Sequence, residues 1–193
     1  TGGCGFIGSH LAEKLIRLGY KVLILDNLST GRLENIKDFE NKISFFKADI
    51  SKLKQIDKYF KNIDIVFHCA ALADIVPSIQ NPKDYYNSNV TGSFNVVSCC
   101  IKHKVKKIIY TASSSCYGIT NKTPTKENEK INPEYPYALT KYLGEQIILH
   151  WSKVYRTKCI SLRLFNVYGP RSRTSGTYGA MFGTFLAQKI SSK

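Results

Sequence analysis

The sequence of 193 residues lacks a long hydrophobic run and is poor in acidic side chains. No run of about eighteen apolar residues occurs, so we expect no membrane-spanning helix and no membrane partner. Only 14 Asp and Glu residues accompany 28 Lys and Arg residues, which gives a formal net charge of +14. The lysines are scattered, and no arginine-rich stripe with interleaved aromatic residues occurs. We therefore expect no nucleic-acid-binding function.

No Cys-x-x-Cys pair occurs among the six cysteines. Reduced, buried thiols of a cytoplasmic protein are the simplest interpretation, and no metal site is predicted. Internal repeats, low-complexity segments and a basic-then-apolar signal segment are also absent from the sequence. With 43% hydrophobic residues, the chain is long enough to form one domain around a sizeable core.

The most informative segment is the glycine-rich loop at the start, where Gly2, Gly5 and Gly8 are spaced three residues apart. Such glycines permit a tight turn, close approach of a pyrophosphate to the backbone, and packing of a helix on its strand. The N-terminus of the following helix then offers N–H groups to phosphates. An ordinary glycine-rich turn is the alternative interpretation.

Downstream residues favour a dinucleotide site. Residues 21–25 form an apolar run typical of a buried parallel strand, and the run ends at Asp26. A carboxylate at this position accepts hydrogen bonds from the adenosine ribose hydroxyls and repels a 2′-phosphate. The pattern therefore predicts binding of NAD in preference to NADP.

The chain has no initiator Met, and no strand precedes the glycine loop. Residues 182–190 also look like a helix that is cut short. We therefore expect a fragment that lacks the first strand and most of a C-terminal substrate lobe. The predicted divisions are an NAD-binding domain over 1–170 and the start of a substrate-binding region over 171–193.

Strand and helix patterns alternate along the chain, which predicts a Rossmann-type, doubly wound α/β fold with a parallel sheet. A polar, proline-bearing surface loop is expected over 120–136. The expected helices cover 11–18, 53–60, 84–102 and 137–155, and the expected strands cover 22–25, 43–46, 63–68, 107–111 and 159–164. Ligands bind beyond the carboxyl ends of such strands, so residues that follow them should converge.

Tyr137 and Lys141 are four residues apart on an expected helix and therefore share a face. A free tyrosine has a pKa of about 10, and a nearby ammonium favours the phenolate, so this pair is a candidate general base. The spacing alone is common by chance. Ser113 supports the interpretation of Tyr137 as a general base, because Ser113 follows a strand and its hydroxyl is placed to hold a substrate oxygen. His68, at the end of another strand, is expected to be structural, and Arg171 and Arg173 are interpreted as either phosphate ligands or solvated loop residues.

Taken together, these segments resemble the extended short-chain dehydrogenase/reductase family, and within it the nucleotide-sugar epimerases. The resemblance extends over nearly the whole chain. It rests on residues 1–11, 25–31, 68–71, 113–118, 137–141 and 163–170, which occur in the family's order.

By that resemblance, Ser113, Tyr137 and Lys141 are catalytic, with Tyr137 as the base, and a UDP-sugar is the substrate. Substrate contacts are expected from Ser113, Ser114 and Asn166. A homodimer is also expected. The residues expected to bind NAD are Gly2, Gly5, Phe6, Ile7, Gly8, Asp26, Asn27, Ser29, Thr30, Gly31, Asp49, Ile50, Cys69, Ala70, Ala71, Asn89, Thr111, Tyr137, Lys141 and Phe165.

The residues after Ser113 favour one reaction of the family. Related dehydratases carry Asp-Glu directly after the catalytic hydroxyl, and related decarboxylases carry a Glu two places after it. Ser114 and Ser115 stand there instead. We therefore expect an isomerase that oxidises and re-reduces C4 of a UDP-hexose through a 4-keto sugar. A dehydratase, a reductase and an inactive NAD-binding fragment are the alternatives.

Overall fold

The computed structural model describes residues 1–120, 123–172, 185 and 188–190. Within these residues, parallel strands form two sheets, one of order β1-β2 and one of order β3-β4-β5. Ile65 lies beside Lys107, which lies beside Lys158. The strands are β1 (Val22–Asp26), β2 (Ile43–Lys47), β3 (Ile65–His68), β4 (Lys107–Ser113) and β5 (Lys158–Leu164).

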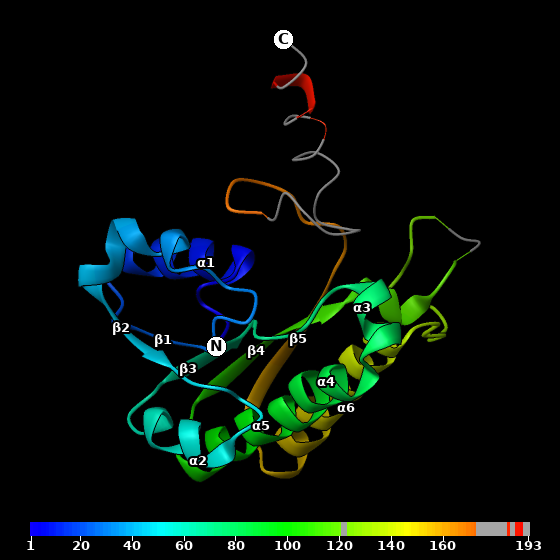
Figure 1. Ribbon diagram of the computed structural model, residues 1–193. Helices are drawn as coiled ribbons and strands as arrows, with labels where there is room; N and C mark the ends of the chain where they lie inside the picture. Colours follow the sequence, from blue (N-terminus) through cyan, green and yellow to red (C-terminus); the bar gives the residue numbers. More distant parts are fainter. Residues whose placement is uncertain (121–122, 173–184, 186–187, 191–193) are drawn as a thin grey trace.

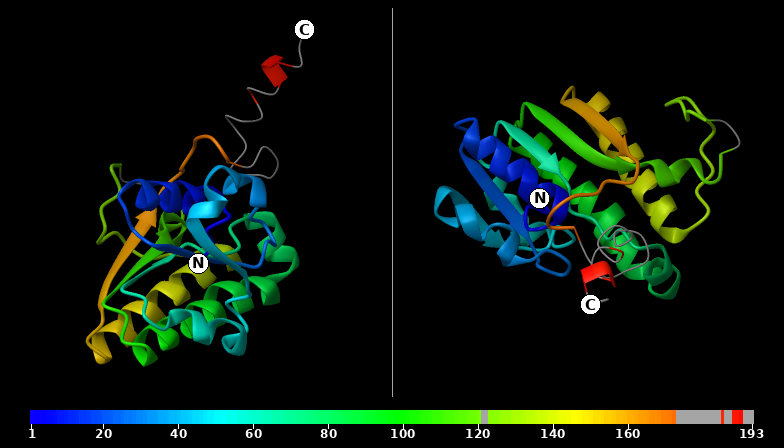
Figure 2. Two further views of the ribbon diagram at one scale, coloured as in Figure 1. Left: turned by 90° about the vertical axis from the view of Figure 1, so that its left-hand side faces the viewer. Right: turned by 90° about the horizontal axis from the view of Figure 1, so that it is seen from above.

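Helices connect successive strands and cover the sheets. Figure 1 shows α1 on one side of the strands and α5 and α6 on the other, and Figure 2 shows the same layers from two further directions. The prediction of a Rossmann-like α/β fold with parallel strands is therefore confirmed. The α-helices are α1 (Phe6–Arg17), α2 (Leu53–Ile56), α3 (Ile75–Gln80), α4 (Pro82–Tyr85), α5 (Gly92–Lys102) and α6 (Pro136–Val154).

Thr1 and Gly2 connect the two sheets through backbone hydrogen bonds. The Thr1 nitrogen donates to the Phe67 carbonyl at 2.8 Å, and the Cys69 N–H donates to the Thr1 carbonyl at 3.1 Å. The Gly2 N–H donates to the Leu25 carbonyl at 2.8 Å. These bonds hold the glycine loop against β1 and β3. That a further strand precedes Thr1 in the whole protein stays a prediction.

The helix expected over 84–102 differs from the observed structure. It begins two residues earlier, and a π-helical segment (Tyr86–Thr91) separates α4 from α5. The π-helical segment carries Asn89, whose buried side chain bonds to two neighbouring elements. A π turn includes an extra residue and shifts the side chains that follow, and the apolar pattern of the sequence does not reveal this shift.

Two smaller differences concern short elements. The helix expected over 53–60 is the α-helical turn α2 followed by a 3₁₀ turn (Asp57–Phe60). The sequence pattern does not predict α3, because this six-residue helix contains Pro77 and is too short for an apolar period to be visible. The loop expected over 120–136 is confirmed in its described residues up to 135, and Pro136 begins α6. The helix expected over 182–190 lies largely outside the described residues. The boundary after residue 170 between an NAD-binding domain and a substrate-binding region stays a prediction.

The larger apolar cluster lies between β3, β4, α5 and α6. Val96, Val97, Ile108 and Ile148 are fully buried there, and Tyr110 lies among them. Burial raises the pKa of Cys99 to about 12, so this thiol stays protonated. A second cluster packs Cys4, Ala12, Ile24, Ile36 and Phe39 between α1 and β1.

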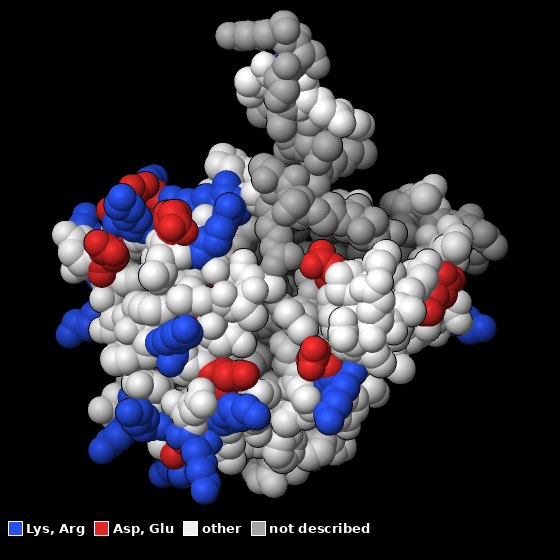
Figure 3. Space-filling view, viewed as in Figure 1, with Lys and Arg blue, Asp and Glu red and all other residues white. Residues whose placement is uncertain are grey.

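The surface agrees with the scattered charges of the sequence. Figure 3 shows Lys and Arg spread over one face, with Asp and Glu among them and no continuous basic stripe over the described residues in view. In the part of the chain that the structure describes, no helix is both long and apolar enough to cross a membrane.

Gly144 sets the distance between α6 and its neighbours. A Cβ atom at this position would lie 2.5 Å from the Asn89 carbonyl oxygen and 2.8 Å from the Tyr110 hydroxyl. Helix propensity alone predicts that Gly144→Ala stabilises the fold by about 1 kcal/mol. We predict the opposite, a loss of about 1–3 kcal/mol of unfolding free energy, because the helix must move away.

Urea denaturation measures this effect, with Gln146→Ala on the exposed face of α6 as the matched control. A Gly144→Ala protein that is more stable than the parent would contradict the packing described here.

Candidate active site

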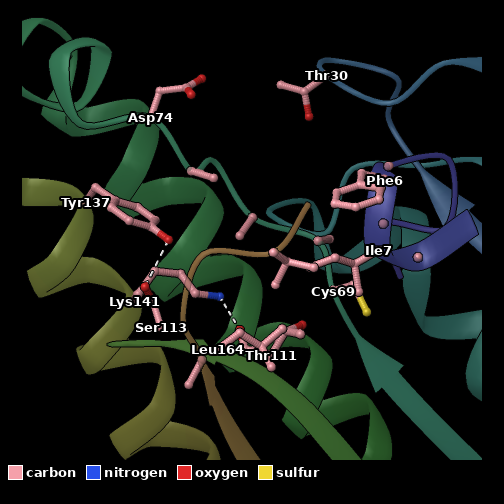
Figure 4. Close-up of a pocket in the computed structure, with 18 of the residues that line it drawn as sticks. Phe6, Ile7, Thr30, Cys69, Asp74, Thr111, Ser113, Tyr137, Lys141 and Leu164 are labelled. Atoms are coloured by element: carbon pink, nitrogen blue, oxygen red, sulfur yellow. Dashed lines mark hydrogen bonds between the residues drawn. The ribbon is translucent and has the colours of Figure 1, made fainter. Parts of the chain in front are cut away.

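A cavity of about 550 Å³ opens at the carboxyl ends of the strands. Its walls come from the glycine loop and α1 on one side, the segments after β3 and β4, the first turns of α6, and the residues after β5. Figure 4 shows Phe6 and Thr30 across this cavity from Tyr137. This is the edge of the sheet at which sequence reasoning expects a ligand.

Most of the predicted site residues line this one cavity. They follow the ends of all five strands. The predicted residue after β2 is Ile50, and Ala48 lines the cavity beside it. The predicted residues that line it are Gly2, Gly5, Phe6, Ile7, Gly8, Asp26, Asn27, Ser29, Thr30, Gly31, Ile50, Cys69, Ala70, Ala71, Thr111, Ser113, Ser114, Tyr137, Lys141, Phe165 and Asn166.

Two predicted residues, Asp49 and Asn89, lie outside this lining. The Asp49 carboxylate accepts the Ser51 N–H at 2.8 Å within its own turn. The Asn89 amide nitrogen donates to the Leu72 carbonyl at 3.0 Å and to Thr140 Oγ1 at 3.1 Å, while its oxygen accepts the Leu72 N–H at 2.9 Å. Asn89 therefore ties the segment after β3 to α6.

The glycine loop folds back closely on itself. Gly2 has φ +71°, a conformation that side chains rarely adopt. The Gly5 N–H donates to the Gly2 carbonyl oxygen at 3.2 Å, and a Cβ atom on Gly8 would overlap that same oxygen. The three glycines thus leave bare backbone beside the start of α1, where N–H groups face the cavity.

Asp26 ends β1 with a buried carboxylate. Its Oδ2 accepts the Cys4 N–H at 2.9 Å, and its Oδ1 accepts the Leu28 N–H at 2.8 Å. A Cβ atom on Gly31 would lie 2.9 Å from both oxygens, so this glycine leaves the cavity side of the carboxylate open. Asp26 therefore presents a fixed negative charge to the cavity.

Tyr137, Ser113 and Ser115 form a chain of hydroxyl groups. The Tyr137 hydroxyl donates to Ser113 Oγ at 3.2 Å, and this bond joins the start of α6 to the end of β4 (Figure 4). Ser113 Oγ also accepts the Ser115 N–H at 3.2 Å and lies 2.7 Å from Ser115 Oγ. Both acceptor positions of Ser113 are thus occupied, so its own proton is directed to Ser115.

Lys141 lies one helical turn after Tyr137 and is buried. Its ammonium donates to the Thr111 carbonyl at 2.6 Å and lies 4.4 Å from the centre of the Tyr110 ring. Burial disfavours the charged form and lowers the pKa of Lys141 to about 8, although Tyr137 acts in the opposite direction. The ammonium therefore lies at the cavity floor, within a network that includes β4.

His68 is structural, as expected from the sequence. Its ring is completely buried, with Nδ1 2.7 Å from Thr1 Oγ1 and Nε2 3.1 Å from Ser93 Oγ. Ser93 donates to the Asn89 carbonyl at 2.6 Å, so Nε2 carries the proton that bonds to Ser93. Burial and the Lys141 charge lower the pKa of His68 well below its usual range, and the ring is neutral.

Arg171 also lines the cavity, and the sequence leaves its role open. Its Nη2 donates to Glu13 on α1 at 2.7 Å. Its Nη1 is buried and has no hydrogen-bond partner within the residues that the structure describes. Arg173 lies outside those residues.

Sequence reasoning missed one acidic residue of the cavity. Asp74 precedes α3 and lines the cavity, on the same side as Tyr137 in Figure 4. It follows β3 by six residues, so the rule that ligands bind beyond strand ends contains the signal that could have found it. The helices expected from the sequence do not include α3, so the sequence does not predict where Asp74 lies.

Comparisons with known proteins agree with this arrangement. The model of the NAD dependent epimerase/dehydratase family matches residues 1–192. A UDP-glucose 4-epimerase of Dictyostelium discoideum is 37% identical over 192 residues, which cover 93% of this chain and 54% of that protein.

Two solved structures are similar over most of this chain. The first is UDP-N-acetylglucosamine 4-epimerase from Methanobrevibacter ruminantium M1 in complex with UDP-N-acetylmuramic acid, with a TM-score of 0.93, 35% identity, and coverage of 100% of this chain and 62% of that one. The second is the Thermus thermophilus UDP-glucose 4-epimerase complex with NAD, with a TM-score of 0.86, 32% identity, and coverage of 92% and 58%.

This chain thus spans between 54% and 62% of the length of these three relatives. The family match, in contrast, extends over nearly all of it. The chain belongs to the NAD dependent epimerase/dehydratase family.

Proposed function

We propose that the whole protein containing this chain is an isomerase that inverts C4 of a UDP-hexose with the help of bound NAD. The observation that carries the proposal is the Tyr137–Ser113 hydrogen bond at 3.2 Å, with Lys141 one turn away in the same cavity. A phenol beside an ammonium can act as the general base that oxidation of a sugar hydroxyl needs, and an alcohol can hold the sugar oxygen.

The cavity fits NAD in shape and in charge. Gly2, Gly5 and Gly8 leave room for a pyrophosphate beside the first N–H groups of α1, and the buried Arg171 Nη1, without a partner among the described residues, supports an anion nearby. Asp26 accepts ribose hydroxyls, with Gly31 keeping its open side free. When bound, NAD supplies reversible acceptance of a hydride from C4 of the sugar.

The chain's own residues handle the proton. Tyr137 takes the proton of the sugar 4-hydroxyl and returns it after inversion. The Lys141 ammonium stabilises the phenolate and binds the nicotinamide ribose. Ser113 holds the sugar oxygen in line. Ser115 accepts the Ser113 hydrogen bond and its N–H donates to Ser113, which leaves one Ser113 lone pair directed towards Tyr137.

Ser114 and Ser115 support inversion over elimination of water. Both line the cavity directly after Ser113, and a neutral hydroxyl is a poor acid or base at pH 7. Asn166, at the exposed start of the segment after β5, is proposed to bind the UDP diphosphate.

We also propose a homodimer in the cytoplasm. Phe94 on α5 is 40% exposed and packs edge-on against Trp151 on α6, with ring centres 5.9 Å apart. Leu139 and Val154 on α6 are 44% and 57% exposed. A second copy would cover these apolar side chains. The six free cysteines support a reducing compartment.

The direct test is product analysis. The whole protein is incubated with UDP-glucose and with UDP-N-acetylglucosamine, and NMR of the sugar protons follows the reaction. The C4 epimer should appear without added NAD beyond what co-purifies. A 4-keto-6-deoxy sugar would identify a dehydratase, steady accumulation of NADH would identify a dehydrogenase, and unchanged substrate would favour an inactive NAD-binding protein.

The first prediction concerns the cofactor. The protein should bind NAD more tightly than NADP by on the order of 100-fold, because the Asp26 carboxylate repels a 2′-phosphate. Asp26→Asn should narrow this ratio, while Asp38→Asn on the exposed surface should leave it unchanged. Titration with both dinucleotides measures the ratio, and equal affinities in the parent protein would contradict the role of Asp26.

The second prediction concerns the base. Tyr137→Phe removes one oxygen and should lower the epimerisation rate about 100- to 10,000-fold with the fold intact. Ser113→Ala should lower the rate while NAD stays bound. Tyr155→Phe, at the exposed end of α6, is the control. A near-normal rate for Tyr137→Phe would remove the assignment.

The third prediction concerns pH. The Lys141 ammonium is the active form, so it is present below its pKa of about 8 and is lost as the pH rises through that value. kcat/KM should therefore fall about tenfold per pH unit above pH 8. In Lys141→Arg the charge persists, so the residual activity should stay level to higher pH. An alkaline decrease that is identical in both proteins would exclude Lys141 as its cause.

A further inference from the structure

Tyr110 contacts both ends of Lys141, and the proposed reaction gives it no role. Its hydroxyl donates to the Lys141 carbonyl at 3.2 Å, and the centre of its ring lies 4.4 Å from the Lys141 ammonium. The same side chain thus holds both the backbone and the charged end of Lys141. Tyr110 is completely buried and lies outside the cavity lining, so it acts on a ligand only through the residues that it contacts.

The position of Tyr110 follows from the alternation of side chains along β4. Successive side chains of a strand point to opposite faces of the sheet, and in β4 residues 108, 110 and 112 are the buried ones. Tyr110 therefore belongs to the apolar cluster beneath α5 and α6. The carbonyl of the next residue, Thr111, accepts a hydrogen bond from the Lys141 ammonium at 2.6 Å (Figure 4). Two consecutive residues of one strand thus hold the ammonium, one by its carbonyl and one by the face of its ring.

The ring compensates for water that the ammonium has lost. Burial disfavours the charged form of Lys141 and lowers its pKa to about 8. The face of an aromatic ring carries partial negative charge and attracts a cation, most strongly where water is excluded. Tyr110 therefore favours the ammonium over the neutral amine at a place where the charged form is costly.

Other titratable groups also face the ammonium, from α6, from β3 and from the segment after β3. They are Tyr137, Glu145, His68 and Cys69. The charge of Glu145 is offset by Arg163, which donates to both carboxylate oxygens at 3.1 Å. His68 is buried and neutral. Tyr110 differs from these groups because burial raises the pKa of its hydroxyl, so the residue stays neutral and acts through its ring face.

We propose that Tyr110 is a positioning residue that holds Lys141 at the cavity floor and keeps it in the ammonium form while Tyr137 acts as the base. The inference rests on the proposed function, because it assumes that the ammonium stabilises the Tyr137 phenolate. Without the ring, the buried charge would lose one of its two described partners on β4. Lys141 would then release its proton at lower pH, and the alkaline decrease of kcat/KM would begin earlier.

A series of side chains at position 110 separates the ring face from the hydroxyl and from the shape. Tyr110→Phe keeps the ring and removes the hydroxyl, and Tyr110→Leu removes the ring. Replacement of Tyr110 by mono-, di- and trifluorinated phenylalanine withdraws electrons from the ring face step by step with little change in size. The same fluorinated residues at Phe60 are the matched control, because Phe60 is buried in the same apolar cluster but precedes β3, at the opposite ends of the strands.

Two measurements on the whole protein follow Lys141. NMR of isotope-labelled lysine side chains reports its titration without turnover, and Lys141→Arg identifies its signal. The pH profile of kcat/KM with UDP-glucose reports the alkaline decrease.

The midpoint of the Lys141 titration should stay near that of the parent in Tyr110→Phe, because the ring face is kept. In Tyr110→Leu and with the trifluorinated ring, the midpoint and the alkaline decrease should both move down by about one pH unit, with the less fluorinated rings in between. At a pH well above 8, kcat/KM is then about tenfold lower than in the parent.

Thermal melting excludes misfolding as the cause of a change, and the fluorinated series decides the question if Tyr110→Leu does not fold. A midpoint that stays the same from phenylalanine to the trifluorinated ring would overturn the role of Tyr110 and leave the proposed reaction standing. A midpoint that follows the series in a protein that converts no UDP-sugar would support the contact between Tyr110 and Lys141 and contradict the proposed function instead.

Discussion

The close packing of α6 against β4 and the π-helical segment is the constraint on which the site depends. Gly144 allows the helix to approach the Asn89 carbonyl, and the Tyr110 hydroxyl donates to the Lys141 carbonyl at 3.2 Å. This approach places the Lys141 ammonium against the Thr111 carbonyl and the Tyr137 hydroxyl against Ser113. A helix displaced outwards by one side-chain width would separate both pairs, because α6 carries Tyr137 and Lys141 while β4 carries their partners.

A second constraint is a network of buried polar groups behind the site that are paired with one another. His68 lies between Thr1 and Ser93, Ser93 bonds to the Asn89 carbonyl, and the Asn89 amide bonds to Leu72 and Thr140. Apart from the local bond between Ser93 and Asn89, each bond joins different segments of the chain, so the glycine loop, the segment after β3 and the helices are fixed relative to one another. In a low-dielectric interior an incomplete network of this kind would be costly, and this favours one arrangement of the cavity walls.

Much of the fold and of the cavity was predictable from the sequence. The glycine spacing, Asp26 at the end of an apolar run and the Tyr137–Lys141 pair each rest on local rules of spacing, and the residues concerned line one cavity. The π-helical segment and α3 were not predictable, because an extra residue per turn and a six-residue helix leave no clear apolar period. The positions of Asn89 and Asp74 depend on long-range contacts with α6 and Tyr85, which no local pattern contains. The functional roles themselves stay proposals.

The hydroxyl chain of Tyr137, Ser113 and Ser115 has a thermodynamic consequence. Without a substrate, the bond from Tyr137 to Ser113 already occupies the acceptor that a sugar hydroxyl would use. A sugar hydroxyl that enters must break the Tyr137–Ser113 bond and form its own bond in its place. The net number of hydrogen bonds therefore changes little. The enthalpy of sugar binding at this point is therefore small. Under the proposed function, most of the affinity comes from the nucleotide part of the ligand, and the sugar itself is held weakly enough to turn between its two faces.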